Sequence, residues 1–309
     1  MPYLRAFGSW LPPRRVTNAE LAPQLGVTPD WVLEATGIEE RRYAADEDTV
    51  AGIGLLAARD CLEHAGMAAA DLGMILAASG SSERFCPGPA SRIAAGLGLN
   101  STPALDIPVP SCGSLIALAL AAQLTPSVGR VLVVGAEIMS RLVDRTPDSK
   151  DTAILFGDGA GACLVDPESG FARIADWNWY TDGASSEILK VEAGRFSMEG
   201  RSVILQVSRK IPRAIADLLA RHQIAPPDVE AYLLHQANLN LIARVAAQVN
   251  APRERFFTNI ARYGNTSSAS LLIAACEWHR AQTAPSSGPI VFAAFGAGLN
   301  WGALLAVPC

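Results

Sequence analysis

Two segments of this chain, about 157 residues apart, show the same order of a helix followed by a buried strand. A helical pattern ends at 58–67 and an apolar strand follows at 71–76. The same pattern returns as a helix ending at 215–224 and a strand beginning at 228. The matched residues are Asp60 with Asp217, Leu62 with Leu219, Met67 with Ile224 and Asp71 with Asp228.

A second pair of segments supports an internal duplication. The β-branched run 130–135 ends in glycine, and 289–296 has the same character at a similar separation. Two related halves of helices and apolar strands predict an α/β fold with a mostly buried sheet. We expect one half in residues 1–165 and the other in 166–309.

Composition excludes several classes of protein. The chain has 309 residues, half of them apolar, and a net charge of −5 without a basic block, which argues against nucleic-acid binding. Neither a signal-peptide pattern nor a long uncharged apolar run is present, so we expect no membrane association. The six cysteines are scattered without a C-x-x-C pair, which predicts no metal site and a cytoplasmic protein with reduced thiols.

Cys112 is the first candidate for chemistry. It directly precedes an apolar helical run, 115–124, that contains no helix breaker. Unpaired N–H groups and the positive end of a helix dipole stabilise a thiolate, which is the nucleophilic form of cysteine. Taken alone, a buried and inert cysteine is the commoner case.

Three further motifs follow along the chain. His235 ends an apolar strand and precedes a helix predicted over 239–249, the position where α/β folds place functional groups. Asn265 opens a cluster of small residues ahead of another apolar helix. Gly296 and Gly298 flank Ala297, whose N–H can then approach an oxyanion closely.

In this order, the motifs resemble the β-ketoacyl-acyl-carrier-protein synthase III family, which has the thiolase fold. The resemblance covers nearly the whole chain and includes Trp31 with 36–38 and the run 156–162. It implies two duplicated βαβ-rich halves in a layered αβαβα arrangement, and it also implies a homodimer.

The resemblance further implies an acyltransferase of fatty acid or polyketide biosynthesis that uses acyl-CoA or acyl carrier protein and needs no metal or redox cofactor. Cys112 is expected to take up an acyl group from the thioester donor. His235 and Asn265 are expected to assist decarboxylation of a malonyl-type thioester, whose carbanion attacks the acyl group. The N–H groups of Cys112 and Ala297 are expected to form the oxyanion hole.

Substrate-binding positions depart from the family pattern. Trp31, Lys150, Asn238 and Cys86 stand at positions that the resemblance assigns to substrate binding, but Lys150 replaces an arginine. Other expected cations, and an aromatic residue, are replaced at 35, 204, 205 and 240. Either the carrier or acceptor has changed, as a secondary-metabolite pathway would explain, or nearby cations substitute: Arg201, Arg209, Lys210 or Arg244.

Cys86 stands where the family places a phenylalanine at the end of the acyl tunnel, so acyl groups larger than acetyl are expected. A register shift of one residue would place Phe85 there instead.

The sequence also bears on several other functions. Transfer of the acyl group from Cys112 to an alcohol or amine stays open. A non-catalytic partner subunit is disfavoured because Cys112, His235 and Asn265 are all present. The run 157–162 formally fits a dinucleotide-binding fingerprint, but an apparent strand at 163–165 follows it where that motif requires a helix. A serine-hydrolase G-x-S-x-G motif is absent.

Overall fold

The strands of the two related segments pair into one ten-stranded sheet in the computed structural model, which describes residues 1–192 and 194–309. The strand order is β12-β11-β13-β14-β8-β1-β7-β6-β4-β5. The N-terminal half contributes β1 (Tyr3–Trp10), β4 (Leu72–Ala78), β5 (Ala104–Ile107), β6 (Arg130–Ile138) and β7 (Asp158–Asp166). The C-terminal half contributes β8 (Ala172–Thr181), β11 (Ala231–Leu234), β12 (Phe256–Phe257), β13 (Ile290–Gly296) and β14 (Asn300–Pro308).

The two halves of the sheet have the same topology. In the first half, β4 is parallel to β5 and β6, and β7 is antiparallel to β6 and β1. In the second half, β11 is parallel to β12 and β13, and β14 is antiparallel to β13 and β8. Only two residue pairs, Tyr3 with Arg173 and Leu4 with Ala172, join the halves through β1 and β8. The division at 165 and 166 remains a prediction, and β7 ends at Asp166 beside it.

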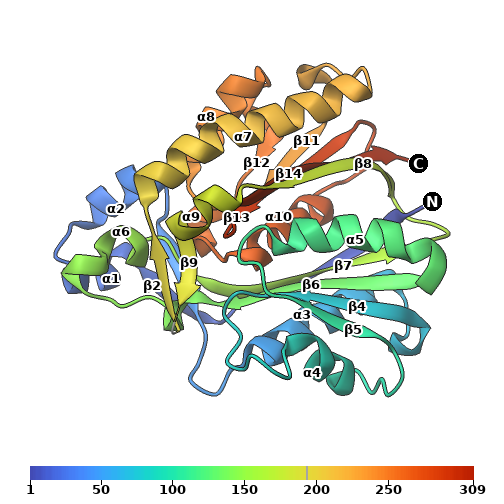
Figure 1. Ribbon diagram of the computed structural model, residues 1–309, viewed down its shortest axis with the longest axis horizontal. Helices are drawn as coiled ribbons and strands as arrows, with labels where there is room; N and C mark the ends of the chain where they lie inside the picture. Colours follow the sequence, from blue (N-terminus) through green and yellow to red (C-terminus); the bar gives the residue numbers. More distant parts are fainter. Residues whose placement is uncertain (193) are drawn as a thin grey trace.

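Helices cover both faces of the sheet and fill the space between its halves (Figure 1). On one outer side lie α3 (Val50–Ala65) and α4 (Pro89–Gly96); on the other lie α7 (Gly200–Arg221) and α8 (Leu239–Val249). Between the halves lie α5 (Gly113–Val128) and α10 (Ser268–Arg280), each in contact with strands of both halves. The predicted layered αβαβα arrangement is confirmed. Because α5 contains no charged residue, its first part can lie in the interior: residues 113–122 are buried apart from the half-buried Leu120, and only the last turns reach solvent.

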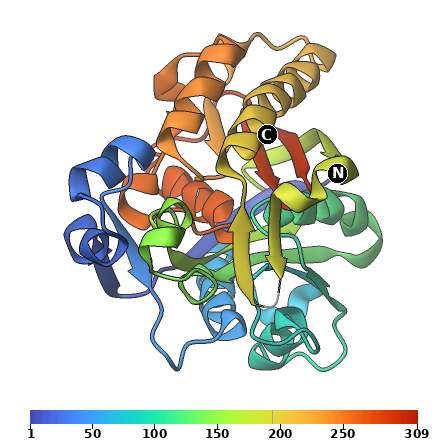
Figure 2. The same ribbon diagram turned by 60° about the vertical axis from the view of Figure 1, so that its left-hand side comes forward.

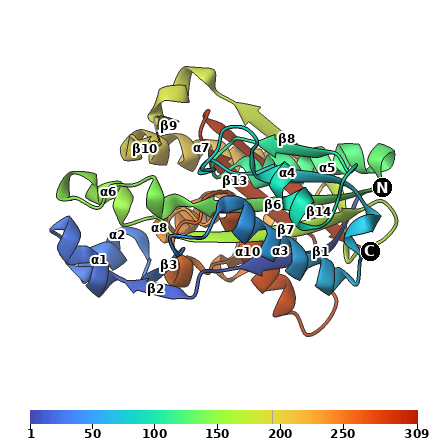
Figure 3. The same cartoon turned by 90° about the horizontal axis from the view of Figure 1, so that it is seen from below.

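Smaller elements gather at one end of the molecule, away from both termini (Figure 3). They include β2 (Arg14–Thr17), α1 (Asn18–Leu25), α2 (Pro29–Thr36), β3 (Glu40–Tyr43), α6 (Lys150–Ala153) and α9 (Ile260–Tyr263). Figure 2 shows the pair of β9 (Leu189–Glu192) and β10 (Arg195–Met198) in front of the central layer.

Arg41, a fully buried side chain of β3, ties these elements to one another. Its guanidinium donates to Asn18 Oδ1 at 2.7 Å and to the Ile154 carbonyl at 2.8 Å, and burial lowers its pKa. Gly157 and Gly264 pack against its Cβ, where side chains of their own would crowd it. The buried guanidinium therefore joins β2, α1 and the end of α6, and the Arg41 Cβ lies next to the segments that carry Gly157 and Gly264.

Two further expectations can be compared with the fold. The run 157–162 lies mainly in β7, so it does not form the strand-to-helix turn of a dinucleotide-binding motif. In the part of the chain that the structure describes, no helix is both long enough and apolar enough to cross a bilayer.

The packing of β1 on α3 leaves no room for a side chain at Gly8. A Cβ there would lie 2.3 Å from the Cys61 nitrogen and 2.5 Å from the Ala57 carbonyl oxygen, both backbone atoms of α3. We expect Gly8→Ala to lower the free energy of unfolding by about 3 kcal/mol, because helix and strand must move apart. Denaturant unfolding measures this, with Gly183→Ala as control, since a Cβ at Gly183 meets no atom within 4 Å. Equal stability of the two variants would contradict the prediction.

Candidate functional site

Cys112 lies at the start of α5, after a sharp turn. The turn places Ser111 at φ 65°, a left-handed conformation that costs free energy in a residue other than glycine. The Cys112 N–H donates to the Pro110 carbonyl at 2.7 Å within this turn. An acyl oxygen would have to share or replace that contact to use this N–H.

The thiol of Cys112 is completely buried. Its Sγ donates to the Ala294 carbonyl at 3.6 Å, and burial raises the pKa of the thiol. This differs from the sequence-based expectation of a stabilised thiolate. Loss of hydration is the cause, and no cationic side chain of the described residues offsets it.

The end of β13 comes close to this turn because residue 296 is glycine. A Cβ at Gly296 would lie 2.0 Å from the Pro110 oxygen and 2.6 Å from the Cys112 nitrogen. Ala297 follows at once, and its carbonyl accepts a hydrogen bond from the Asn300 side chain. The structure thus brings the two predicted oxyanion-hole residues, Cys112 and Ala297, into one region.

His235 follows β11 and is buried, with its ring held by two neighbours. Ser270 Oγ lies 2.6 Å from Nδ1, and the ring of Phe295 packs edge-on at 5.2 Å. Ser270 Oγ already accepts the Gln236 N–H at 3.1 Å, so its own proton is available for Nδ1. The ring then carries its hydrogen on Nε2 and can donate one hydrogen bond from that atom.

Asn265 has a similarly fixed side chain. Its Oδ1 accepts the Ser267 N–H at 2.9 Å, which leaves its NH2 group as the free donor. Ser267 Oγ in turn accepts the Ser111 N–H at 2.9 Å, next to Cys112. The loop before α10 is therefore bonded directly to the turn that carries the thiol.

A cavity of about 360 Å³ leads to these groups. His235 and Asn265 line it together with Ser111, and Trp31 lines it as a partly exposed side chain. Lys150 Nζ lies 5.9 Å from the centre of the Trp31 ring, so two predicted substrate-binding residues stand together near the surface.

Asn238 also lines this cavity, but its side chain is used structurally. Its Oδ1 caps α8 through the Asn240 and Leu241 N–H groups, and its Nδ2 donates to the Ala35 carbonyl at 2.9 Å. Asn240 donates to the Glu34 carbonyl at 3.0 Å. Both amides therefore hold α2 against α8, at the place where the family pattern has a cation.

A second cavity, of about 620 Å³, adjoins the other side of the nucleophile turn. Pro110 and Ala297 line it, as does the fully exposed side chain of Phe85. Leu189 lines both cavities, whereas the consecutive residues Pro110 and Ser111 line one cavity each, so this turn lies between them. Cys86 is exposed on the same loop as Phe85 and lines neither cavity within the part of the chain that is described.

Sequence reasoning missed the residues that hold the wall of this second cavity. Glu137 is fully buried at the end of β6 and accepts hydrogen bonds from Gly80 N and Ser81 Oγ, at 3.1 and 2.5 Å. It also accepts the Ser268 N–H at 3.3 Å, which links this wall to α10. A single acidic residue in an otherwise apolar strand was the available signal.

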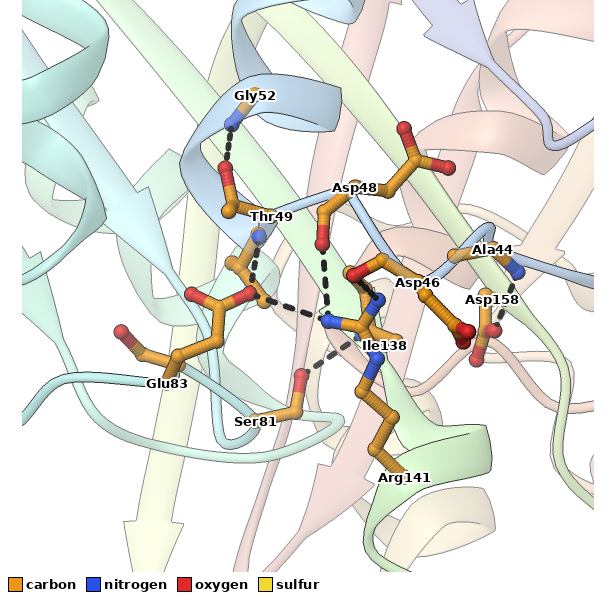
Figure 4. A network of polar contacts seen from close by, with 12 residues as sticks. Ala44, Asp46, Asp48, Thr49, Gly52, Ser81, Glu83, Ile138, Arg141 and Asp158 are labelled. Carbon is orange, nitrogen blue, oxygen red and sulfur yellow. Dashed lines mark hydrogen bonds and ion pairs between the residues drawn. The ribbon is translucent and has the colours of Figure 1, made fainter.

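Arg141, directly after β6, contacts the residues that follow Ser81 in the wall of this cavity (Figure 4). Its guanidinium donates to the Asp48 carbonyl at 2.9 Å and lies 3.8 Å from Glu83. Glu83 also accepts the Val50 N–H at 2.6 Å. The segment from Ser81 to Glu83 is thereby anchored to the ends of both β6 and α3.

The described residues contain no group of three or more His, Cys, Asp or Glu side chains that could hold a metal ion. The arrangement offers a buried thiol beside a turn whose Pro110 lines one cavity and whose Ser111 lines the other, with two neutral hydrogen-bond donors in the cavity that Ser111 lines. Such a pair of donors can stabilise charge developing on a carbonyl oxygen.

Comparison with known proteins identifies relatives over the full length. Two family models match: 3-oxoacyl-[acyl-carrier-protein] synthase III over residues 105–183 and its C-terminal part over 219–307. The β-ketoacyl-[acyl-carrier-protein] synthase III of Oleidesulfovibrio alaskensis is 35% identical, with 98% of each chain covered. That of Rhodobacter capsulatus is 34% identical, covering 98% of this chain and 97% of the relative.

Solved structures of the same family have a similar fold. The crystal structure of 3-oxoacyl-[acyl-carrier-protein] synthase III from Aquifex aeolicus is 32% identical, with a TM-score of 0.95 over 99% of this chain and 100% of the other. A priming β-ketosynthase of the R1128 polyketide pathway is 28% identical, with a TM-score of 0.91 over 100% and 96% of the chains. These likenesses support the thiolase fold that the sequence predicts.

The burial of His235 makes the stability of the folded chain depend on pH. It lowers the pKa of His235 to about 3, whereas the unfolded imidazole titrates near 6.5. As the pH falls between these values, the unfolded chain binds a proton that the folded chain does not. His235 therefore reduces stability progressively as the pH falls through this window.

We expect the free energy of unfolding of the natural chain to fall more steeply than that of a His235→Gln variant between pH 5.5 and 4.5. The difference is up to about 1.4 kcal/mol per pH unit. Denaturant titrations of both chains across this range measure it. Parallel pH profiles would show that the ring protonates freely in the folded protein.

Proposed function

The chain belongs to the β-ketoacyl-acyl-carrier-protein synthase III family of condensing enzymes, and we propose that Cys112, His235 and Asn265 carry out its condensation. The observation that carries this assignment is the position of the Cys112 turn between two cavities, with His235 and Asn265 lining the first. The first cavity suits the extended arm of a thioester, and the second suits the acyl group left on the sulfur.

In the first step, the Cys112 sulfur attacks the carbonyl carbon of an acyl thioester. A new thioester forms at Cys112, the old carbon–sulfur bond breaks, and the thiol proton ends on the departing thiol. Because burial raises the pKa of Cys112, the proton leaves only as this exchange proceeds. Acyl-CoA and acyl carrier protein are the donors that we expect.

In the second step, a malonyl-type thioester occupies the first cavity. The NH2 group of Asn265 and the Nε2–H of His235 donate to its thioester oxygen. Loss of CO2 leaves an enolate, whose charge these two donors stabilise. Its carbon attacks the acyl carbonyl on Cys112, the carbon–sulfur bond to Cys112 breaks, and the sulfur leaves as a thiolate that takes up a proton from water.

The tetrahedral intermediates of both transfers place negative charge on an oxygen near Cys112 and Ala297. We assign their N–H groups to that oxygen. Support comes from the side-chain bond of Asn300 to the Ala297 carbonyl, which holds the turn, and from the close approach that Gly296 permits.

The family relationship also bears on the oligomeric state, and the second cavity bears on the size of the acyl group. We expect a homodimer that needs no metal or redox cofactor and works in the cytoplasm, in fatty acid or polyketide biosynthesis. The second cavity favours acyl groups larger than acetyl. Cys86 and the exposed Phe85 lie on a loop that a partner subunit could meet.

Intact mass spectrometry after incubation with a panel of acyl-CoAs and acyl carrier proteins tests the nucleophile. We expect a gain of one acyl group with the preferred donor, and no gain for Cys112→Ala. Cys163→Ala is the matched control, since Cys163 is equally buried but lies in β7, outside both cavities. Acylation that persists in Cys112→Ala would contradict the assignment, as would no acylation by any donor.

Ser270→Ala tests the fixed imidazole. Without the Ser270 hydroxyl, the imidazole hydrogen can lie on Nδ1. Molecules with this tautomer of His235 have no donor at Nε2. We expect decarboxylation of a malonyl thioester to slow about tenfold or more, with little change in acylation of Cys112. Separate assays of released CO2 and of acyl-enzyme mass measure the two steps. An equal loss in both would indicate a general packing defect instead.

A further inference from the structure

Glu137 is a buried acid that meets only uncharged groups. Its side chain is fully buried at the end of β6, and every hydrogen bond that it forms with the described residues comes from a hydroxyl or a backbone N–H. An acid removed from water without a cation beside it depends on such donors for its stabilisation. The segments that supply these donors are therefore the segments that Glu137 holds in place.

These segments belong to the two sides of the site. Oε2 accepts hydrogen bonds from the hydroxyls of Ser79 and Ser81, at 3.2 and 2.5 Å, and Gly80 N lies 3.1 Å from both carboxylate oxygens. Ser79 and Gly80 line the second cavity. Oε1 also accepts the N–H of Ser268, the first residue of α10, at 3.3 Å. One side chain thus connects the wall of the second cavity with the start of the helix that follows Asn265.

The start of α10 has no side-chain cap from its own segment. Ser267 occupies the N-cap position but makes no side-chain cap bond, and its Oγ instead accepts the Ser111 N–H at 2.9 Å. The first N–H groups of a helix have no partner within the helix, and a negative charge near them is favourable. Glu137, from the other half of the chain, fills this role for the N–H of Ser268. The position of this helix start therefore depends on Glu137.

The side chain of Asn265 depends on the same helix start. Its backbone is held independently, since Asn265 N donates to the Leu155 carbonyl at 2.8 Å and Gly157 N donates to the Asn265 carbonyl at 3.1 Å. Its amide makes one hydrogen bond with the residues described, which runs from the Ser267 N–H to Oδ1 at 2.9 Å. That bond keeps the oxygen turned toward Ser267 and the NH2 group free for a substrate.

Ser267 holds this N–H in place in a strained conformation. Its φ of 47° and ψ of −125° form a combination that glycine adopts readily and that a Cβ disfavours. Two contacts oppose its relaxation: Ser111 binds its Oγ, and Glu137 binds the N–H of the next residue. If the second contact is lost, Ser267 can return to a negative φ, and its N–H turns away from Oδ1. The Asn265 amide is then free to turn over and to present its oxygen to the substrate.

We propose that Glu137 is a positioning residue for decarboxylation. It touches no substrate in this role and acts through Ser268 and Ser267 on the orientation of Asn265. The inference rests on the condensing function proposed above. It implies a specific dependence: Glu137 is needed because Ser267 has to be kept in its strained conformation, so the need diminishes when that strain is removed.

A double-variant cycle tests this dependence. Glu137→Met removes the acceptor at similar size, and Ser267→Gly removes the strain, since glycine adopts the same backbone conformation freely. Glu137→Asp is used as well, because it keeps the charge if the apolar variant fails to fold, and the shorter side chain first loses its longest contact, with Ser268. Asp166→Leu is the matched control, since Asp166 is also buried, lies at the opposite end of the same strand pair and binds Arg130.

Release of CO2 from a malonyl thioester and the mass of the acyl-enzyme are measured for each variant. We expect Glu137→Met to slow decarboxylation about tenfold or more in the natural background, and by less than about threefold in the Ser267→Gly background. Glu137→Asp gives the same pattern with a smaller loss. Acylation of Cys112 changes by the same factor in both backgrounds, and Asp166→Leu leaves both steps within about twofold. Equal losses of decarboxylation in the two backgrounds would overturn the proposal, because Glu137 would then act without Ser267.

Crystal structures of the same variants need no turnover. We expect Ser267 to leave the positive-φ region in Glu137→Met or Glu137→Asp, and Asn265 Oδ1 to lose the Ser267 N–H. An unchanged conformation of Ser267 and Asn265 would overturn the proposal whether or not the chain condenses any substrate. Failure of the natural chain to release CO2 from any malonyl thioester, with these shifts present in the variants, would instead count against the proposed function.

Discussion

The contact between the starts of the two buried helices organises the site. Ser111, just before α5, donates its N–H to Ser267, just before α10, and Ser114 of α5 donates to the Ser268 carbonyl. Both Ser111 and Ser267 have positive φ, so each turn depends on the other for support. The thiol-bearing turn comes from one half of the chain and the Asn265 loop from the other, and this contact sets their separation.

Desolvation controls the resting state of the reacting groups. It raises the pKa of Cys112 and lowers that of His235, so both are neutral before substrate arrives. A neutral imidazole with its hydrogen on Nε2 is a donor and not a cation, and Asn265 offers the same kind of group. Burial without a charged partner thus prepares the site for charge that appears on substrate oxygens during reaction.

The centre and the rim of the site differ in how closely they follow the family pattern. The central residues Cys112, His235 and Asn265 match it, whereas Ala35 and Asn240 at the rim do not. Asn240 has become part of the contact between α2 and α8. Asn240 is exposed, so a residue at this position can change without disturbing the packed layers beneath.

The sequence by itself predicted an α/β fold of two related halves and several of its strands and helices, and its resemblance to the family added the layered arrangement and the residues to examine as the nucleophile and its partners. Periodicity, the apolar helix after Cys112 and the ordered motifs are local properties, so they can be read along the chain. The tertiary structure alone decided that the Asn238 side chain binds Ala35 of α2, that Ser270 and Glu137 support the site, and that the Cys112 thiol has a raised pKa. These depend on burial and on contacts between segments more than 30 residues apart, such as Glu137 with Ser268, for which no local pattern exists.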